Sequence, residues 1–349
     1  MKIAIDVSPL QTGHRVRGVG FYLENLKNAL VKYFPQNEYI FFEAGEKLPD
    51  DIDLVHFPYF EPFFLELPLY KKFKTVVTVH DLTPIVFPKA FPRGLKGEIR
   101  WQMQKYALKR ADSIIVDSQC SKKDVLKYVG VKEKKISVVY LAAGEQFKVL
   151  DHKSWILDLR AKYKLPEKFV LYVGDVTWNK NLPRLLDAVT QVEAPLVMVG
   201  KSLVSENYDK DNPWNADLNR VNELAKDNKN IIKLGFVPDE DLIKIYNMAT
   251  ALVMPSLYEG FGLPVLEAMS CGCPVICSKE GSLQEVAGDA AHFVDAYDVK
   301  SITTGIKEVF GNKKLQEELS RRGIENVKRF SWEKTAEETV KAYEGVLGK

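Results

Sequence analysis

The chain has 349 residues, of which 46% are hydrophobic and 28% are charged, and its formal net charge is +2 at pH 7. These values are typical of a soluble globular protein with room for two domains, and a charge so close to zero gives no support for nucleic-acid binding. No apolar stretch reaches the roughly 20 residues that a membrane-spanning helix needs.

The first ten residues, MKIAIDVSPL, predict a β-strand rather than a targeting segment, because Asp6 and Pro9 interrupt the apolar core that a signal peptide needs. The four cysteines form no C-x-x-C pair and have no nearby histidines, which favours buried or idle thiols in a reducing compartment. We therefore expect a cytoplasmic protein.

Short β-branched and aliphatic runs alternate with helical segments along the whole chain. Such runs are typical of strands buried on both faces of a parallel sheet, and their alternation with helices indicates βαβ units. The first half contains runs at 2–7, 39–44, 53–58, 75–81, 113–118 and 136–141, and the second half at 169–175, 195–200, 230–237, 251–256, 274–279 and 291–296.

A charged segment near 145–168 separates the two series of runs. We therefore predict an α/β protein with two doubly wound, Rossmann-like domains, residues 1–150 and 151–330. Ligands of open α/β sheets bind beyond the carboxyl ends of the strands. If the two domains face each other, those ends border one cleft, and the turns after the strands hold the candidate site.

Gly18 and Gly20 precede an amphipathic helix near the N-terminus. They do not fit the G-x-G-x-x-G dinucleotide fingerprint, because Leu23 stands in place of the third glycine and the loop from Pro9 is too long. We interpret them as a flexible glycine loop that lines the cleft.

His80 and Asp81 end a strongly apolar strand in the first half of the chain. A histidine at the carboxyl end of a strand can donate to a sugar hydroxyl or carbonyl. The alternative is a hydrogen-bonded core histidine, and the segment alone does not separate the two.

The segment Arg93–Arg110 has the spacing of a basic amphipathic helix. Leu95, Ile99, Met103 and Tyr106 fall on one face, and lysines and arginines surround them. A solvated helix face and a contact with a membrane surface both fit this pattern.

In the second half, YVGDVTWNKN ends a strand at Gly174 and leads into a helix near Asn181, with Lys180 at the helix entrance. A lysine there adds a full charge to an anion site made by the N–H groups of the helix start. An ordinary surface lysine is the alternative.

The stretch SLYEGFGLPVLEAMSCG, residues 256–272, joins a buried strand to a helix and holds Glu259 and Glu267. Gly260 and Gly262 let the backbone approach a ligand, and Pro264 suits a first helical turn. The helix start would bind phosphate, and Glu267, about one turn in, would reach a ribose diol. The alternative is an ordinary βα turn with a capping glutamate.

Three D-x-D sequences, at 51–53, 209–211 and 239–241, lie in polar, loop-like contexts rather than at strand ends. We interpret them as solvated charge and expect no metal site. No G-x-S-x-G turn is present, and no Ser–His–Asp set is indicated. We also expect no cofactor apart from the substrates.

The chain resembles the family-4 type of retaining glycosyltransferases with the GT-B fold, also called the glycosyl transferases group 1 family. The most specific match is EGFGLPVLE, with its E-x7-E spacing, followed by AMSCGCPVI. Nearly all the rest of the chain matches in the family's order through RGVGFY, VHDLTP, IIVDSQCSKKDV, YVGDVTWNKNLPRLLDA, LGFVPDEDLIKIYNMA and RFSWEKTAEETVKAYEGVL.

The resemblance implies a nucleotide-sugar donor in the C-terminal domain and an acceptor, a glycan or lipid-linked molecule, facing the N-terminal one. His80 and Glu259 would be the catalytic residues beside the reacting sugar. A helix at about 331–349 would pack back on the N-terminal domain. The residues implied in donor binding are Gly18, Gly20, Lys180, Gly260, Phe261, Gly262, Leu263 and Glu267.

One departure concerns the phosphate site, because many relatives carry an arginine where this chain has Asp175 or Asn179. Arg15 or Arg17 is a candidate substitute, and Asp175 is a candidate for holding the sugar or the acceptor. Asp81 and Asn179 are further candidate site residues.

The family picture is metal-independent front-face attack with retention, in which the leaving phosphate takes the acceptor's proton and Glu259 orients and stabilises. We favour GDP-mannose as the donor. The alternatives are a nucleotide-sugar epimerase of the same fold and a non-catalytic sugar-nucleotide-binding subunit. Nucleotide release with formation of a new glycoside would separate transfer from both.

Overall fold

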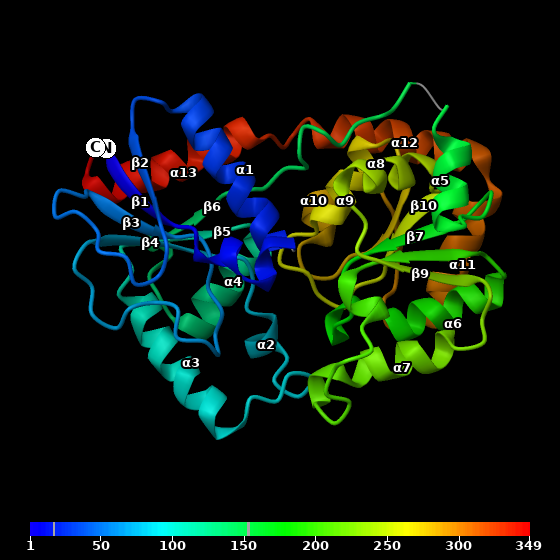
Figure 1. Ribbon diagram of the computed structural model, residues 1–349, viewed down its shortest axis with the longest axis horizontal. Coiled ribbons are helices and arrows are strands. Elements are labelled where there is room, and N and C mark those ends of the chain that lie inside the picture. The colour runs from blue at the N-terminus through cyan, green and yellow to red at the C-terminus, as the bar shows by residue number, and fades with distance from the viewer. Residues whose placement is uncertain (17, 152–153) are drawn as a thin grey trace. The chain divides into compact units, whose positions relative to one another are not determined.

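The computed structural model describes residues 1–16, 18–151 and 154–349 and divides into two compact units (Figure 1). Unit 1 comprises Met1–Ala142 together with Phe330–Lys349, and unit 2 comprises Ala143–Arg329. Each unit contains a parallel six-stranded sheet. Each of the twelve apolar runs of the sequence overlaps a strand, which confirms the predicted α/β class with two doubly wound, Rossmann-like sheets.

Unit 1 has the strand order β2-β1-β3-β4-β5-β6, with every neighbouring pair parallel. Its elements are β1 (Lys2–Asp6), α1 (Gly18–Tyr33), β2 (Glu38–Phe42), β3 (Leu54–Phe57), β4 (Lys74–Val79), α2 (Thr83–Val86), α3 (Gly94–Lys109), β5 (Ser113–Val116), α4 (Gln119–Asp124), β6 (Ile136–Val138) and the C-terminal α13 (Trp332–Leu347).

The C-terminal helix α13 packs against α1, although it is the last element of the chain. The Trp332 ring lies edge-on to the Phe21 ring at 6.2 Å, and the Tyr343 hydroxyl hydrogen-bonds Nδ1 of the buried His56 at 2.8 Å. Ala336, Tyr343 and Trp332 are all buried, so this helix completes the core of unit 1.

Unit 2 has the strand order β12-β11-β10-β7-β8-β9, again with only parallel neighbours. Its elements are α5 (Ile156–Tyr163), β7 (Val170–Val173), α6 (Leu182–Val192), β8 (Leu196–Val199), α7 (Ala216–Ala225), β9 (Ile231–Gly235), α8 (Asp239–Met248), β10 (Ala251–Met254), α9 (Leu263–Ser270), β11 (Val275–Ser278), α10 (Leu283–Ala287), β12 (His292–Val294), α11 (Val299–Gly311) and α12 (Lys313–Val327).

Helices cover both faces of the second sheet: Figure 1 shows α6 and α7 on one side of its strands and α8 and α9 on the other. α6 is amphipathic, with Leu182, Leu185, Leu186 and Val189 all buried. This i, i+3, i+4, i+7 pattern directs one stripe of the helix into the core, where it packs against α11.

The strand order fixes where ligands can bind. In unit 2 the chain reverses its winding direction between β7 and β10, and in unit 1 it reverses between β1 and β3. Side chains following these strands meet at the carboxyl edge of the sheet, in the crevice that doubly wound folds use for ligands. The loops after β7 and β10 carry Lys180 and Glu259.

One expectation for the N-terminal loop differs from the structure. Gly18 and Gly20 lie in the first turn of α1, rather than in a flexible loop before it. A Cβ on Gly20 would lie 2.3 Å from the carbonyl oxygen of Arg15, so a glycine is required for the preceding turn to pack on the helix. Arg17, a candidate cation, lies outside the described residues.

Candidate active site

The loops after β7 and β10 meet in an ion pair. Nζ of Lys180 lies 2.8 Å from both carboxylate oxygens of Glu259, which stands 79 residues further along the chain. The side chains of Lys180 and Glu259 are 20% and 8% exposed. Because both charges are largely removed from water, each depends on the other for compensation. The two charges that the sequence assigned to phosphate and sugar therefore neutralise each other in this structure.

Two asparagines beside Lys180 join the two loops. The Asn179 side chain donates to the Tyr258 carbonyl at 3.0 Å, and the Asn179 carbonyl accepts from the Leu257 N–H at 2.7 Å. The buried Asn181 donates to the carbonyls of Pro255 and Ala296 at 2.9 and 2.7 Å. Asn179, one of the further candidate site residues, thus positions the Glu259 loop.

The turn Gly260–Leu263 is shaped by backbone contacts that the sequence analysis missed. Ser282, at the start of α10, donates its hydroxyl to the carbonyls of Glu259 and Phe261 at 3.1 and 2.7 Å. A Cβ on Gly281 would lie 2.5 Å from the Glu259 backbone. Gly262 has φ 103° at the start of α9, a conformation that favours glycine. Gly281 and Ser282 therefore support the Glu259 turn, and only the close packing of α10 on this turn reveals that role.

Glu267 lies in α9 and is 8% exposed. Tyr246 of α8 donates its hydroxyl to one carboxylate oxygen of Glu267 at 2.8 Å. Burial raises the pKa of Glu267 to about 7, although the Tyr246 hydrogen bond opposes this shift. A carboxyl with a pKa near 7 is partly ionised at neutral pH, and its ionised form can accept hydrogen bonds from a ribose diol. The spacing of the sequence did not reveal Tyr246 as its hydrogen-bond partner.

Asp175 lies two residues after the end of β7, and its hydrogen bonds reach the turn after β8. Its carbonyl accepts from the Tyr172 hydroxyl at 2.8 Å, and its carboxylate accepts from the Ser202 N–H at 3.2 Å. The Ser202 hydroxyl in turn accepts from the Val176 N–H at 3.0 Å. These bonds tie the end of β7 to the turn after β8. Asp175 therefore shapes the loop that carries Lys180.

In unit 1, His80 and Asp117 meet at the ends of the neighbouring strands β4 and β5. Nδ1 of His80 lies 2.6 Å from Oδ2 of Asp117, which is 2% exposed. The Tyr22 ring packs edge-on against the imidazole, with 4.7 Å between ring centroids. Nε2 of His80 is buried and has no hydrogen-bond partner among the described residues. Asp117 thus fixes the ring and leaves Nε2 available.

The pKa of His80 is the balance of opposed effects. Burial lowers it, but the charge and hydrogen bond of Asp117, with a smaller contribution from Asp81, raise it more, so the net shift is upward. A raised pKa favours the imidazolium, in which Nε2 carries a proton that it can donate. Asp81 itself accepts from the Thr83 N–H at 2.8 Å at the start of α2.

The carboxyl edge of unit 1 also gathers acidic groups that the sequence analysis did not single out. Tyr59 donates its hydroxyl to Glu61 at 2.5 Å, after β3. Burial, and then the charges of Glu61 and Asp6, raise the pKa of Glu66 to about 8. Carboxyl and phenol groups of this kind hydrogen-bond hydroxyls, yet nothing in local sequence shows that these residues lie near β1.

The described residues contain no group of three or more His, Cys, Asp or Glu side chains that could hold a metal ion. Of the D-x-D residues, Asp241 differs from expectation, because it is 9% exposed and pairs with Lys162 at 2.6 Å. Cys271, Cys273 and Cys277 are buried free thiols as predicted, and Cys120 is half-buried.

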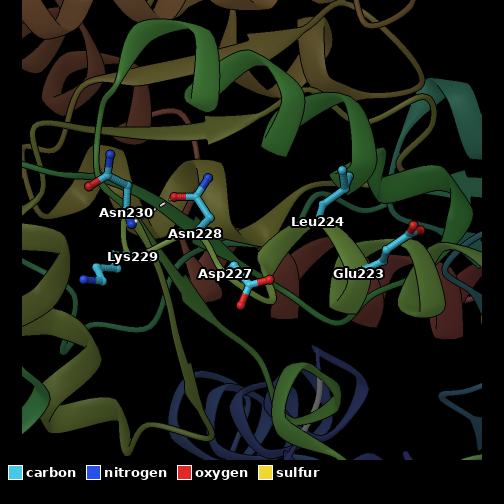
Figure 2. Close-up of a pocket in the computed structure, with 6 residues that line it drawn as sticks. All are labelled: Glu223, Leu224, Asp227, Asn228, Lys229 and Asn230. Carbon is cyan, nitrogen blue, oxygen red and sulfur yellow. Dashed lines mark hydrogen bonds between the residues drawn. The ribbon is translucent and has the colours of Figure 1, made fainter.

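A separate hollow of about 550 Å³ lies beside the turn from α7 to β9. Figure 2 shows its polar lining, in which the Asn230 N–H donates to the Asn228 side chain at 3.0 Å. It adjoins the amino end of β9, whereas ligands of such sheets bind at the carboxyl ends. We therefore assign the site to the Lys180 and Glu259 loops.

The fold and the switch-point loops agree with the family comparisons. Residues 156–326 match the family described as Glycosyl transferases group 1, and residues 7–142 match Glycosyltransferase Family 4. The O-antigen chain mannosyltransferase B of Escherichia coli is 33% identical over 280 residues, covering 77% of this chain and 70% of that protein. The chain belongs to the family-4 glycosyltransferases, with the GT-B fold.

Other relatives and solved structures agree. The serotype-specific mannosyltransferase WbdA of Escherichia coli is 30% identical over 280 residues, 78% of this chain but 34% of that protein. Sucrose-phosphate synthase of Thermosynechococcus elongatus has the same fold at a TM-score of 0.76 and 20% identity, covering 100% and 99% of the two chains. Anabaena HepE in complex with UDP and glucose has a TM-score of 0.72 at 16% identity, covering 98% of each chain. No helix of the described residues has the length and hydropathy to span a membrane.

Proposed function

We propose that this glycosyltransferase moves mannose from GDP-mannose to a glycan or lipid-linked acceptor, with retention of configuration and without a metal ion. The observation that carries the proposal is the Lys180–Glu259 pair at the β7/β10 switch point, with 2.8 Å to each carboxylate oxygen. A cation beside a carboxylate is suited to a substrate whose leaving group is anionic and whose sugar becomes positive in the transition state.

In this proposal Lys180 has two partners. Its ammonium carries three N–H donors, and the two bonds to Glu259 leave one for a phosphate oxygen of the donor. The Gly260–Leu263 backbone and the start of α9 add N–H groups at the same anion. Charge on the leaving diphosphate is thereby stabilised by groups that are already in place, so no metal is required.

Glu259 and Glu267 have separate roles in the proposal. Glu259, held by Lys180, stabilises positive charge on the reacting sugar, while Glu267 binds the ribose hydroxyls. Front-face attack accounts for retention: the acceptor oxygen bonds to the anomeric carbon as the bond to phosphate breaks, and the leaving phosphate oxygen takes the acceptor's proton. From the family resemblance we assign His80 to the donor sugar, and Gly18 and Gly20 to the phosphates.

The choice of mannose rests on relatives. Two relatives, O-antigen chain mannosyltransferase B and the serotype-specific mannosyltransferase WbdA, are mannosyltransferases of Escherichia coli. The O-antigen chain in the name of the first relative supports a glycan or lipid-linked acceptor. We place the protein in the cytoplasm, with peripheral contact at the inner face of the membrane through Arg93–Arg110, and we assign it no cofactor.

A direct test uses purified protein, labelled GDP-mannose or UDP-glucose, and a pool of lipid-linked and free oligosaccharide acceptors. We expect nucleotide release and a new glycoside with GDP-mannose, with the α-configuration of the donor kept. Activity should persist in excess chelator. A loss of more than about tenfold that Mg²⁺ or Mn²⁺ restores would contradict metal independence.

The same assay separates the other activities of this fold. Conversion of the nucleotide-sugar without acceptor would identify an epimerase. Binding without turnover would identify a non-catalytic subunit. A thermal-shift series over nucleotides supplies the binding measurement, because a ligand at 100 times its dissociation constant stabilises the fold by about 2.7 kcal/mol.

A further inference from the structure

Helix α3 carries apolar side chains on its solvent face as well as on its core face. Gly97, Trp101 and Ala107 face the core and are buried. Leu95, Ile99 and Tyr106 are 79%, 53% and 52% exposed. An ordinary surface helix has polar groups on its outer side, so a stripe of this kind indicates a surface that meets something apolar.

A second segment, residues 63–71, lies alongside this helix. The buried Gln104 of α3 accepts from the Leu67 N–H at 2.9 Å and donates to the Leu67 carbonyl at 3.2 Å. Lys71 donates to the Arg110 carbonyl at 3.0 Å, which fixes the other end of the segment. The segment thereby presents four further exposed side chains beside the helix, Phe64, Leu65, Leu69 and Tyr70, at 51%, 58%, 44% and 83%.

Residues 63–71 together with α3 and its flanks, 93–110, form what we call the α3 surface. It contains seven of the fourteen large apolar side chains that are exposed in the described part of the chain. The other seven are distributed over α1 and unit 2. Single exposed apolar residues are common on protein surfaces. Half of the exposed large apolar side chains, however, lie within these two adjoining segments, and we therefore regard them as a patch.

The charge of the α3 surface is as uneven as its hydrophobicity. Residues 63–71 and 93–110 contain seven lysines and arginines but two carboxylates, whereas the whole chain has 49 basic and 47 acidic residues. Glu98 is already paired with Arg93 at 2.5 Å. Lys96, Arg100 and Lys109 are exposed.

We propose that the α3 surface docks on an anionic lipid bilayer, with its apolar side chains in the interface and its cations at the lipid phosphates. This inference rests on the peripheral membrane contact of the proposed function and deepens it, because it adds residues 63–71 to the helix noted in the sequence and names anionic lipid as the partner. Apolar and aromatic groups flanked by lysine and arginine are the composition of interfacial helices. An acidic protein partner would pair with the lysines and arginines, but it would not account for the exposed apolar side chains of Tyr70 and Leu95.

The test is co-sedimentation of the full chain with vesicles of phosphatidylglycerol and phosphatidylcholine. We expect binding that requires the anionic lipid and weakens as salt rises. Lys96→Ala with Lys109→Ala should reduce partitioning by roughly 25-fold at low salt, because each cation near such a surface contributes about fivefold. The matched control is Lys313→Ala with Lys314→Ala on α12, which should not change binding.

The apolar contribution has its own matched pairs. Leu95→Asp and Phe64→Ser should each reduce partitioning about tenfold or more. Leu157→Asp and Phe236→Ser, at residues of unit 2 that are 75% and 56% exposed, should leave it unchanged. Thermal unfolding checks that every variant is folded, and nucleotide binding, which our proposal assigns to unit 2, should be unchanged in the variants of unit 1.

Three outcomes would overturn the proposal: no vesicle binding at low salt, equal binding to pure phosphatidylcholine, or equal losses in the control variants. Binding to soluble poly-glutamate without vesicle binding would assign the α3 surface to an acidic protein partner instead. Because vesicle binding is measured without substrate, failure here leaves the proposed transfer activity standing, and failure of that activity leaves the docking result unaffected.

Discussion

The two units share a parallel six-stranded sheet but differ at their switch points. In unit 2 the loops meet through the Lys180–Glu259 pair, whose charges cancel. In unit 1 the carboxyl edge carries Glu61 and Glu66 in addition to the His80–Asp117 pair, so carboxyl groups predominate. The same architecture therefore provides one edge suited to an anion and one suited to neutral, hydroxyl-rich molecules. Fold defines where a ligand binds, and the loop residues define which one.

The largest expected effect concerns the charge-balanced edge of unit 2. Lys180→Met should lower kcat/KM by about a hundredfold or more, because it removes a charged contact to phosphate worth roughly 1.5–3 kcal/mol and also releases Glu259. It should also lower the unfolding free energy by roughly 3 kcal/mol, since a largely buried carboxylate loses its cation. Kinetics and denaturant unfolding measure the two effects.

The double variant Lys180→Met with Glu259→Gln separates structure from chemistry. Removing both charges should restore most of the stability while transfer stays lost. Normal turnover by Lys180→Met would show that the pair is only structural and that the phosphate lies elsewhere.

The next effect distinguishes the two glutamates within unit 2. Glu259→Gln should lower kcat, because its charge acts on the transition state, whereas Glu267→Gln should raise the donor KM with kcat nearly kept. A charged hydrogen bond of roughly 1.5–3 kcal/mol corresponds to about 10- to 150-fold in either case. Steady-state kinetics with varied donor measure both constants. The reverse pattern would mean that the two roles are exchanged.

A smaller effect tests the acidic edge of unit 1. Asp117→Asn should lower kcat/KM about tenfold, because Asp117 acts only by positioning and charging His80. The wild-type pKa of His80 is raised, so the imidazolium is lost only as pH rises through that raised value. Without the Asp117 charge, the pKa falls and the alkaline limb of the pH–rate profile should move to lower pH.

The matching control is Asp81→Asn, whose charge contributes less to the pKa of His80. It should move the alkaline limb less than Asp117→Asn does. A profile that keeps its position in Asp117→Asn, with activity merely reduced, would show that Asp117 has a structural role and does not set the protonation of His80.

The smallest effect is on stability without ligand. Burial raises the pKa of Glu267 from 4.5 to about 7, so the folded state binds this proton more tightly than the unfolded state. The contribution of Glu267 to stability is therefore greatest below pH 4.5 and falls as pH rises towards 7, by a few kcal/mol at most. Glu267→Gln should match the wild type near pH 5 and unfold several degrees higher at pH 8.

Thermal unfolding at the two pH values measures this difference. The control is Glu317→Gln, at a side chain that is 69% exposed. Its unfolding temperature should differ from that of the wild type by the same small amount at both pH values. If Glu267→Gln unfolds no higher than the wild type at pH 8, burial does not raise the pKa of Glu267 towards 7. The ribose-binding role of Glu267 then rests on family resemblance alone.

The local sequence was sufficient to predict where the strands of this protein lie. A strand buried on both faces requires a continuous apolar run, and the turn after β10 requires glycine where φ reaches 103°, so composition and spacing revealed twelve strands and the Glu259 turn. The first turn of α1 was missed, because glycines at a helix start have the same composition as a glycine loop.

Contacts between separate βα loops were decided only by the tertiary structure. Lys180 meets Glu259, and His80 meets Asp117, because β7 adjoins β10 and β4 adjoins β5 in the sheets. Strand order depends on how helices cover both faces, which no local pattern encodes. The orientation of α3 is a similar case: its sequence carries apolar residues on two sides, and the tertiary structure buries Trp101 and leaves Leu95 exposed.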